Sequence, residues 1–326
     1  MSNETVGVIL AAGEGRRMGA ISAHFPKPVL PVCNRPLIAK HLEILRDIGV
    51  AEAVVVVGHQ KELVSSTALR WCPEGMQLHF VEQTERLGIA HALYLTREIV
   101  LDRDVVVILG DTHFIVDDPK FALERLNESR NGDRVAGVLS VRSVRDPELI
   151  RRECTVRFDF EGRLVDIQEK PAVPFNDLKP CGIYFFSSEI FEAIEMTEPS
   201  SLRGEVEITD SIQTLVDMGF VVTSAPTVVW DRNINYPGDI LMSNLVELKR
   251  GQRKVLIGEG VSIHPDARIS TSVIGNRARI NAPVKMLRSL VLDDAVLDVH
   301  GEYVDAIVFS RFAIGDCLKE EWGDTP

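Results

Sequence analysis

The sequence predicts an α/β protein with a mostly parallel sheet, followed by a short parallel β-helix. In the first 250 residues, short apolar runs alternate with stretches in which apolar residues recur every three or four positions, as in strands alternating with helices. After residue 250, isoleucines recur at six-residue intervals, a spacing typical of β-helix coils. We therefore expect two domains, residues 1–250 and 251–326.

Composition and charge narrow the class of protein. The 326 residues suffice for one large domain and a smaller one, and a hydrophobic content of 45% indicates a globular chain. The formal net charge of −12 argues against a nucleic-acid partner. No apolar run approaches the roughly 18 residues of a membrane span, and no basic segment precedes an apolar one at the N-terminus. We expect a cytoplasmic protein with no membrane partner.

The five cysteines are odd in number and form no C-x-x-C pair. This pattern favours reduced thiols over a disulfide framework or a zinc site.

Along the large domain, the pattern predicts elements in a regular order. Strands are expected at 6–11, 53–57, 78–81 and 105–109, with helices at 37–48, 61–70 and 89–100 between or beside them. Further strands are expected at 135–141, 155–158 and 164–167, and further helices at 208–218 and 238–249. The carboxyl ends of parallel strands share one edge of a sheet, where ligands bind.

The loop after the first predicted strand carries the first candidate site. Gly13 and Gly15 lack a Cβ, so backbone N–H groups can approach an anion, and Arg17 adds a permanent forked charge. Lys27 follows on a backbone stiffened by flanking prolines. These features predict a phosphate-binding loop, although a strand followed by G-x-G also fits an ordinary connection with solvated arginines. The loop matches neither a P-loop nor a dinucleotide-binding fingerprint.

Polar residues follow the third and fourth predicted strands. The Gln83 amide can pair with the edge of a nucleotide base, and Gly88 would let the backbone approach the ring, although a solvated loop glutamine fits equally well. Asp111 ends an apolar strand, where a carboxylate needs a cation or hydrogen bonds. It is the candidate ligand of Mg²⁺, which favours one or two carboxylates together with substrate phosphates. The alternative for Asp111 is a helix cap.

Two motifs together carry a family resemblance. The pattern L-A-A-G-x-G-x-R-M followed by P-K-P-x-x-P resembles the signature of sugar-1-phosphate nucleotidyltransferases, and of glucose-1-phosphate thymidylyltransferases and uridylyltransferases within them. The resemblance implies a Rossmann-like sheet with a left-handed β-helix after it. It also implies transfer of a nucleotidyl group from dTTP or UTP to a sugar 1-phosphate, with Mg²⁺ as cofactor and pyrophosphate as second product.

The resemblance implies roles for individual residues. It assigns catalysis to Arg17, Lys27 and Asp111. It assigns nucleotide binding to Leu10, Ala11, Ala12, Gly13, Gly15, Gln83 and Gly88. It assigns the sugar phosphate to Cys154, Glu169, Lys170 and Gly182, and the metal to Asp111 and Asn233. Because neighbouring side chains of a strand point to opposite faces, Glu169 and Lys170 are not expected to form merely a mutual salt bridge.

Two of these residues depart from the family pattern. Cys154 stands where a glycine often faces the sugar ring, and Asn233 stands where an aspartate is usual, with Asp231 and Asn235 close by in sequence. These departures motivate an alternative function, a catalytically inactive nucleotide-sugar-binding regulatory paralogue.

The C-terminal repeat contains isoleucines at 257, 263, 269, 274 and 280. The repeat is short, and its histidines, His264 and His300, are expected to be turn residues rather than catalytic bases. We therefore expect the tail to serve assembly of a homo-oligomer.

Overall fold

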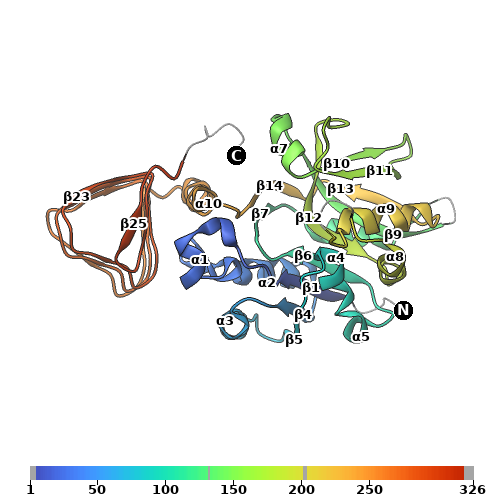
Figure 1. Ribbon diagram of the computed structural model, residues 1–326, viewed down its shortest axis with the longest axis horizontal. Helices are drawn as coiled ribbons and strands as arrows, with labels where there is room; N and C mark the ends of the chain where they lie inside the picture. The colour runs from blue at the N-terminus through green and yellow to red at the C-terminus, as the bar shows by residue number, and fades with distance from the viewer. Residues whose placement is uncertain (1–4, 131–132, 201–203, 319–326) are drawn as a thin grey trace. The chain divides into compact units, whose positions relative to one another are not determined.

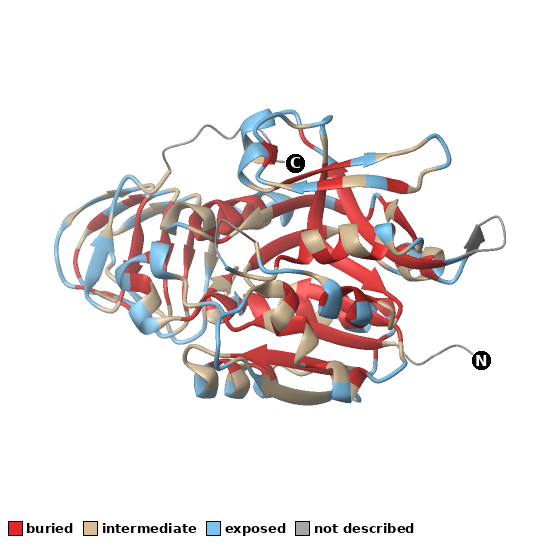
Figure 2. Ribbon diagram, turned by 45° about the vertical axis from the view of Figure 1, so that its right-hand side comes forward, coloured by how far each residue is buried: buried red, intermediate tan, exposed pale blue. Residues whose placement is uncertain are grey.

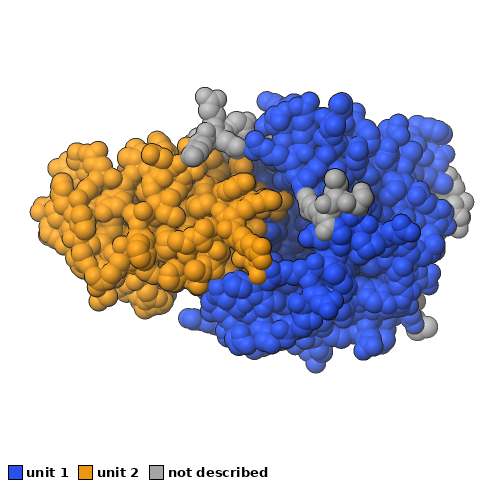
Figure 3. Space-filling model, in the orientation of Figure 1, with its two compact units in different colours: residues 1–13, 38–231 blue, residues 14–37, 232–326 orange. Residues whose placement is uncertain are grey.

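The computed structural model describes residues 5–130, 133–200 and 204–318, and the chain forms two compact units (Figures 1 and 3). Unit 1 contains residues 1–13 and 38–231, and unit 2 contains residues 14–37 and 232–326. This division differs from the expected boundary at residue 250. Segment 14–37 and the helix that ends at Arg250 share one apolar core with the C-terminal strands, and therefore belong with them.

Unit 1 is built on a mixed, mostly parallel sheet. Its strand order is β13-β9-β12-β6-β1-β4-β5, with β8 (Ser129–Arg130) paired to β9. β12 runs antiparallel to both β6 and β9, whereas the other neighbours on the main path are parallel. The strands are β1 (Val6–Ala11), β4 (Glu52–Val57), β5 (Gln77–Glu82), β6 (Val105–Leu109), β9 (Asp133–Ser143), β12 (Leu178–Phe186) and β13 (Val221–Ala225).

Helices pack against both faces of this sheet. Figure 2 shows that the strands of the sheet consist mostly of buried residues. On one face, Val6 and Val8 lie in a core with residues of α4, α8 and α9. On the other, α2 packs so closely that a Cβ at Gly7 would lie 2.5 Å from a methyl carbon of Leu45. The helices are α2 (Leu37–Ile48), α3 (Lys61–Arg70), α4 (Ile89–Tyr94), α5 (Arg97–Val100), α6 (Lys120–Leu126), α7 (Pro147–Arg152), α8 (Ile190–Met196) and α9 (Ile208–Asp217).

Two small pairs of strands lie mainly in unit 1. They are β10 (Cys154–Phe158) with β11 (Leu164–Glu169), and β7 (Thr112–Val116) with β14 (Val228–Asn233). The single helix expected at 89–100 is instead two short helices, because the chain turns at Leu95 and Thr96, where the Thr96 hydroxyl donates to the Leu93 carbonyl.

Among the described residues, no helix is both long enough and apolar enough to cross a membrane.

Unit 2 is organised around α10 (Pro237–Arg250). Its apolar side chains share a core with Met18, Ile21 and Leu30 from segment 14–37 and with Val273 and Phe309 from the C-terminal strands. Segment 14–37 contains the 3₁₀ turns η1 (Arg16–Met18) and η2 (Lys27–Val29), the helix α1 (Ala20–His24) and a hairpin of β2 (Pro31–Val32) and β3 (Arg35–Pro36).

The C-terminal strands of unit 2 stack as a short parallel β-helix. The paired strands follow at a constant offset of 17 residues, as in Val255↔Ser272 and Val273↔Leu290. The strands are β15 (Val255–Ile257), β16 (Ser262–Ile263), β17 (Arg268–Ser270), β18 (Ser272–Ile274), β19 (Arg279–Ile280), β20 (Val284–Leu287), β21 (Leu290–Val291), β22 (Val296–Leu297), β23 (Gly301–Val304) and β24 (Ile307–Phe309), with β25 (Phe312–Ile314) antiparallel to β24.

The predicted isoleucines occupy the inside of the coils. Ile274 and Ile280 are fully buried, whereas Ile257 and Ile263, their partners in the first coil, are 53% and 36% exposed. Outside the coils, side chains 17 residues apart pair with one another: Arg277 with Asp294, Arg288 with Asp305 and Lys285 with Glu302. The β-helix is therefore held by backbone ladders, an apolar interior and exterior ion pairs.

Candidate functional site

The carboxyl end of β1 is enclosed by glycines of its two neighbouring strands. A Cβ at Gly110, after β6, would lie 2.5 Å from the Leu10 carbonyl oxygen, and one at Gly58, after β4, would lie 2.8 Å from that of Ala12. Ala12 is buried, and Gly13 is exposed. The backbone predicted to bind nucleotide thus lies at the predicted sheet edge, and Gly58 is a further small residue there that sequence reasoning missed.

Gln83 follows β5 at the same edge of the sheet, and its side-chain amide forms hydrogen bonds that stabilise the loop after β5. Its Nε2 lies 3.1 Å from the Gly88 carbonyl oxygen and 3.3 Å from His91 Nδ1. Since an amide nitrogen only donates, His91 accepts through Nδ1 and carries its proton on Nε2. Both N–H donors of Gln83 are engaged, which leaves Oε1 as the atom that can accept a bond from a base.

Gly88 is a position that only glycine fits. Its φ is 110°, and a Cβ there would lie 2.4 Å from the Val206 carbonyl oxygen. Val206 donates to the Leu87 carbonyl at 2.7 Å and accepts from the Ala90 N–H at 3.1 Å. The loop predicted to bind the base is therefore fixed by a segment more than a hundred residues later in the chain.

Asp111 lies in the turn between β6 and β7, half-buried. The next residue, Thr112, is held by His41 of α2, whose Nε2 lies 2.7 Å from the Thr112 carbonyl oxygen. Burial lowers the pKa of His41 to about 4, against the opposing effect of this bond. His41 is therefore a neutral donor at physiological pH, and it fixes the backbone beside the predicted metal ligand.

The predicted sugar-phosphate residues lie on β10, β11 and β12. Cys154 on β10 pairs with Glu169 on β11, and burial raises the pKa of the Cys154 thiol, which is neutral. Gly182 has a φ of 76° within an irregular stretch of β12, and a Cβ there would lie 2.8 Å from a Leu109 methyl carbon. These positions supply a carboxylate, a small thiol and a close backbone approach.

Glu169 and Lys170 form a mutual salt bridge, so the strand alternation that would place them on opposite faces does not hold here, and their roles toward the sugar phosphate stay predictions. Their side chains are partly exposed, and Lys170 Nζ lies 3.3 Å from Glu169 Oε1. Lys170 follows the last residue of β11 and has a φ of 45°, so it no longer obeys the alternation of the strand. Its N–H also donates to the Glu153 carbonyl at 2.6 Å.

A buried group of charges adjoins these residues, and sequence reasoning missed it. Lys179 of β12 is fully buried and bonds to Glu153 and, at 2.5 Å, to Asp231 of β14. Asp231 also accepts from Arg142 of β9 at 2.5 Å. Two cations thus face two carboxylates in the interior of unit 1. Asp231, a sequence neighbour of the predicted metal ligand Asn233, is committed to this cluster.

The charges of this cluster support one another. Burial alone would favour a neutral Asp231, but Lys179 and Arg142 outweigh it, and the pKa of Asp231 is lowered. Burial likewise disfavours a charged Lys179, but Asp231 and Glu153 raise its pKa. Burial raises the pKa of Glu153, whose side chain keeps about 20% of its surface exposed. The cluster ties together four segments, two of which, those of Glu153 and Lys179, continue directly to the predicted sugar residues Cys154 and Gly182.

The predicted phosphate-binding cations belong to unit 2. Gly15 caps η1 with a φ of 65°, and a Cβ there would lie 3.1 Å from Lys27 Cγ, so the Lys27 stem runs along the glycine loop. Lys27 is 8% exposed, and its Nζ lies 3.4 Å from Asn235 Oδ1. Arg17 is exposed. Gly15 and Lys27, twelve residues apart in the chain, thus lie against each other.

Asn233 ends β14, and Asn235 precedes α10. Asp239 accepts from the backbone N–H groups of Asn235 at 2.9 Å and Tyr236 at 2.7 Å, which fixes the residue that contacts Lys27. Asn235 is therefore a further candidate residue of this group. The signal that finds it is the capping pattern N-Y-P-G-D.

The two predicted metal ligands, Asp111 of unit 1 and Asn233 of unit 2, are each of a kind that Mg²⁺ prefers. Among the described residues, no three His, Cys, Asp or Glu side chains are grouped as a metal site. Mg²⁺ does not require such a group, because one or two protein oxygens and substrate phosphates suffice. Asp111 offers a carboxylate and Asn233 an amide oxygen, which are the hard ligands that this ion prefers.

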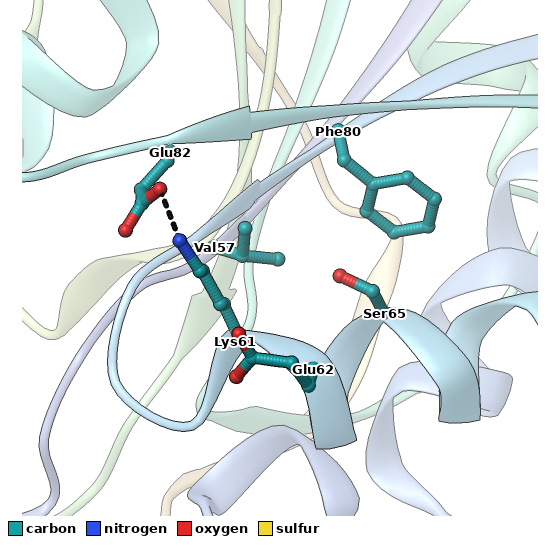
Figure 4. A pocket seen from close by; sticks show the side chains of 6 residues that line it. All are labelled: Val57, Lys61, Glu62, Ser65, Phe80 and Glu82. Atoms are coloured by element: carbon teal, nitrogen blue, oxygen red, sulfur yellow. Dashed lines mark hydrogen bonds and ion pairs between the residues drawn. The ribbon is translucent and has the colours of Figure 1, made fainter.

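One surface hollow lies apart from the predicted residues. It measures about 340 Å³ and is lined by residues of β4, β5 and α3, including Val57, Phe80 and the ion pair of Lys61 with Glu82 at 2.6 Å (Figure 4). Glu82 is the last residue of β5 and precedes Gln83 directly, but Gln83 does not line the hollow. The hollow carries none of the predicted site residues.

Comparison with known proteins agrees with the sequence motifs. Residues 6–231 match the family model described as nucleotidyl transferase. The chain is 28% identical over 311 residues to a glucose-1-phosphate thymidylyltransferase of Streptomyces antibioticus, which covers 95% of this chain and 82% of that one. It is 32% identical over 234 residues to the UTP–glucose-1-phosphate uridylyltransferase AglF of Haloferax volcanii, covering 71% and 92%.

The fold also has a close counterpart among solved structures. A UDP-glucose pyrophosphorylase complexed with UDP-glucose superimposes with a TM-score of 0.65 at 21% identity, covering 77% of this chain and all of that one. At this identity the likeness concerns the fold. Because the family model spans more than half of the residues, including both the glycine loop and the Asp111 turn, the chain belongs to the nucleotidyl transferase family.

Proposed function

We propose that this protein transfers a nucleotidyl group from UTP or dTTP to a sugar 1-phosphate, releasing pyrophosphate. The observation that carries the proposal is the pairing of the glycine loop with Lys27, within a chain of this family. The Lys27 side chain is 8% exposed and lies against the glycine loop, and its ammonium is a group that binds the phosphates of a nucleoside triphosphate. The relatives named as thymidylyltransferase and uridylyltransferase support the choice of substrates.

The chemistry requires positioning more than proton transfer. A phosphate monoester has a second pKa near about 6, so the attacking oxygen of the sugar phosphate is already ionised at neutral pH. That oxygen bonds to the α-phosphorus, the bond from this phosphorus to the bridging oxygen breaks, and pyrophosphate leaves with the electron pair. Arg17 and Lys27 neutralise the triphosphate, and Lys170 binds the sugar phosphate.

In this proposal Asp111 and Asn233 hold Mg²⁺. When bound, the ion supplies positive charge to the phosphate oxygens. His41 fixes the backbone beside Asp111, and Asp239 fixes the backbone near Asn233.

The base is a pyrimidine with a protonated N3, in this proposal. Gln83 uses both of its N–H donors within its own loop, so Oε1 faces the base as an acceptor. Uracil and thymine offer N3–H, whereas cytosine has a lone pair at N3. A purine is disfavoured by its size.

The test is pyrophosphate release with UTP, dTTP, CTP, ATP and GTP, each with glucose 1-phosphate and N-acetylglucosamine 1-phosphate in the presence of Mg²⁺. Turnover with UTP or dTTP and loss of turnover in Asp111→Asn support the proposal. Nucleotide-sugar binding without pyrophosphate release from any pair would instead support the regulatory alternative, which Asn233 and Cys154 motivate. A clear preference for GTP would refute the role of Gln83.

A further inference from the structure

The hairpin that follows Lys27 is clamped by one buried side chain of α10. Asn244 is fully buried, and its Oδ1 accepts from the Cys33 N–H at 2.7 Å. Its Nδ2 donates to the Pro31 carbonyl at 2.9 Å and to the Ile240 carbonyl at 2.8 Å. The donors and the acceptor of this amide are therefore all used, and two of its three bonds go to the hairpin rather than to its own helix.

The tip of the hairpin reaches the β-helix. Cys33 and Asn34 have φ values of 51° and 63°, the pair of left-handed residues that a two-residue hairpin turn requires. Asn34 Nδ2 donates at 2.9 Å to the carbonyl of Ile274 in β18. Non-glycine residues in this conformation persist where their surroundings hold them, and here α10 and a coil of the β-helix do so.

The anchored hairpin is close to Lys27 along the chain. Leu30 is the link, because its N–H donates to the Lys27 carbonyl at 3.1 Å and its carbonyl accepts from Leu37 at 3.0 Å. The Leu30 side chain is fully buried in the core that also contains Leu245 and Val273. Leu30 thus connects the hairpin to the Lys27 segment both through backbone hydrogen bonds and through its packed side chain.

We infer that Asn244 and Asn34 are positioning residues for Lys27, and that the β-helix takes part in the reaction by holding the lysine-bearing segment. The inference rests on the proposed function for its effect on turnover. It gives the C-terminal repeat a role beyond assembly, since Ile274 and Val273 are residues of the repeat itself. The effect should fall on kcat, because Lys27 binds charge that develops on the leaving pyrophosphate.

Two variants test the inference, each against a matched control. Asn34→Gly removes the bond to Ile274 but keeps the turn, because glycine adopts a positive φ readily. Asn244→Ala removes the clamp. The control is Asn276→Ala, since Asn276 also bridges neighbouring coils through its amide, to Asp293 at 3.1 Å, and its hydrogen bonds within the described part of the chain go to other coils rather than to the hairpin. The measurements are kcat, the KM of each substrate, the melting temperature and hydrogen exchange at 27–37.

We expect kcat to fall about tenfold in Asn34→Gly and about 10²-fold in Asn244→Ala, with the KM of the sugar phosphate within about twofold. Exchange at 27–37 should quicken in both. Asn276→Ala should lower the melting temperature while keeping wild-type kcat and exchange at 27–37. Wild-type kcat in both hairpin variants, or an equal loss in the control, would overturn the inference.

The exchange measurement separates this inference from the proposed function. If the wild-type protein releases no pyrophosphate with any substrate pair, the proposed function fails. Faster exchange at 27–37 in the two hairpin variants, but not in Asn276→Ala, then still supports the anchoring, and unchanged exchange overturns it.

Discussion

Replacing His41 should remove an acid-sensitive component of stability. Its pKa in the folded protein is about 4, whereas an unfolded histidine titrates near 6.5, so the unfolded state binds more protons between these values. Stability conferred by neutral His41 is therefore complete above pH 6.5, declines as the pH falls towards 4 and declines no further below it. Between pH 7.5 and 5.0 the loss amounts to about 2 kcal/mol.

The assay is urea unfolding at pH 7.5 and 5.0 for the wild type, His41→Gln and His41→Leu. Glutamine keeps an N–H donor for Thr112 without a titrating group, so its free energy of unfolding should fall by about 2 kcal/mol less than that of the wild type. Leucine leaves the Thr112 carbonyl without this donor and also lacks the titrating group, so the free energy of unfolding of His41→Leu should lie about 1 to 3 kcal/mol below that of His41→Gln at both pH values. His300→Gln, on the exposed surface, is the control and should follow the wild type. Identical pH dependence in the wild type and His41→Gln would refute the assignment.

Three further predictions concern the site. Asp111→Asn should lower kcat by about 10² or more with an unchanged far-ultraviolet circular dichroism spectrum, and wild-type turnover in the folded variant would exclude Asp111 as the metal ligand. Lys179→Met leaves Asp231 buried without one of its cations and should lower the free energy of unfolding by about 3 to 5 kcal/mol in a denaturant titration; a loss below about 1 kcal/mol would show that the cluster is dispensable. His91→Leu frees one donor of Gln83, so the kcat/KM ratio of UTP over CTP should fall about tenfold, and an unchanged ratio would contradict the proposed orientation of the amide.

The elements with the strongest local signals could be predicted from the sequence. β1 and α2 have the predicted bounds, because an apolar run followed by glycine and an apolar periodicity ended by Gly49 leave few alternatives. The sheet edge that carries Gln83 and Asp111 follows from the same pattern. The division into two units could not be predicted, because it depends on the core in which α10 is buried. The apolar face of an amphipathic helix shows that the helix packs against something, but it does not specify the neighbouring element.

The buried polar residues could not be predicted, for a physical reason. Lys179 stands in the strand sequence L-K-P-C-G-I-Y-F-F, where a single lysine normally faces solvent. Its burial depends on Glu153 and Asp231, which lie 26 and 52 residues away in the chain. Asn244 is equally inconspicuous on its helix, and its role becomes visible only beside the hairpin. Polar residues at a distance in sequence are paired by tertiary structure, which local patterns do not encode.

The constant offset of 17 residues between stacked coils restricts how this region can change in length. An insertion or deletion of 17 residues adds or removes one whole coil and returns every later side chain to its former side, so Ile274 and Ile280 stay inside and Arg288 still meets Asp305. An insertion of another length within a strand breaks this 17-residue register and separates the ion pairs along the stack, unless the extra residues loop out at a corner of the coil. The β-helix is thus a region in which a change of chain length is accommodated in whole coils of 17 residues.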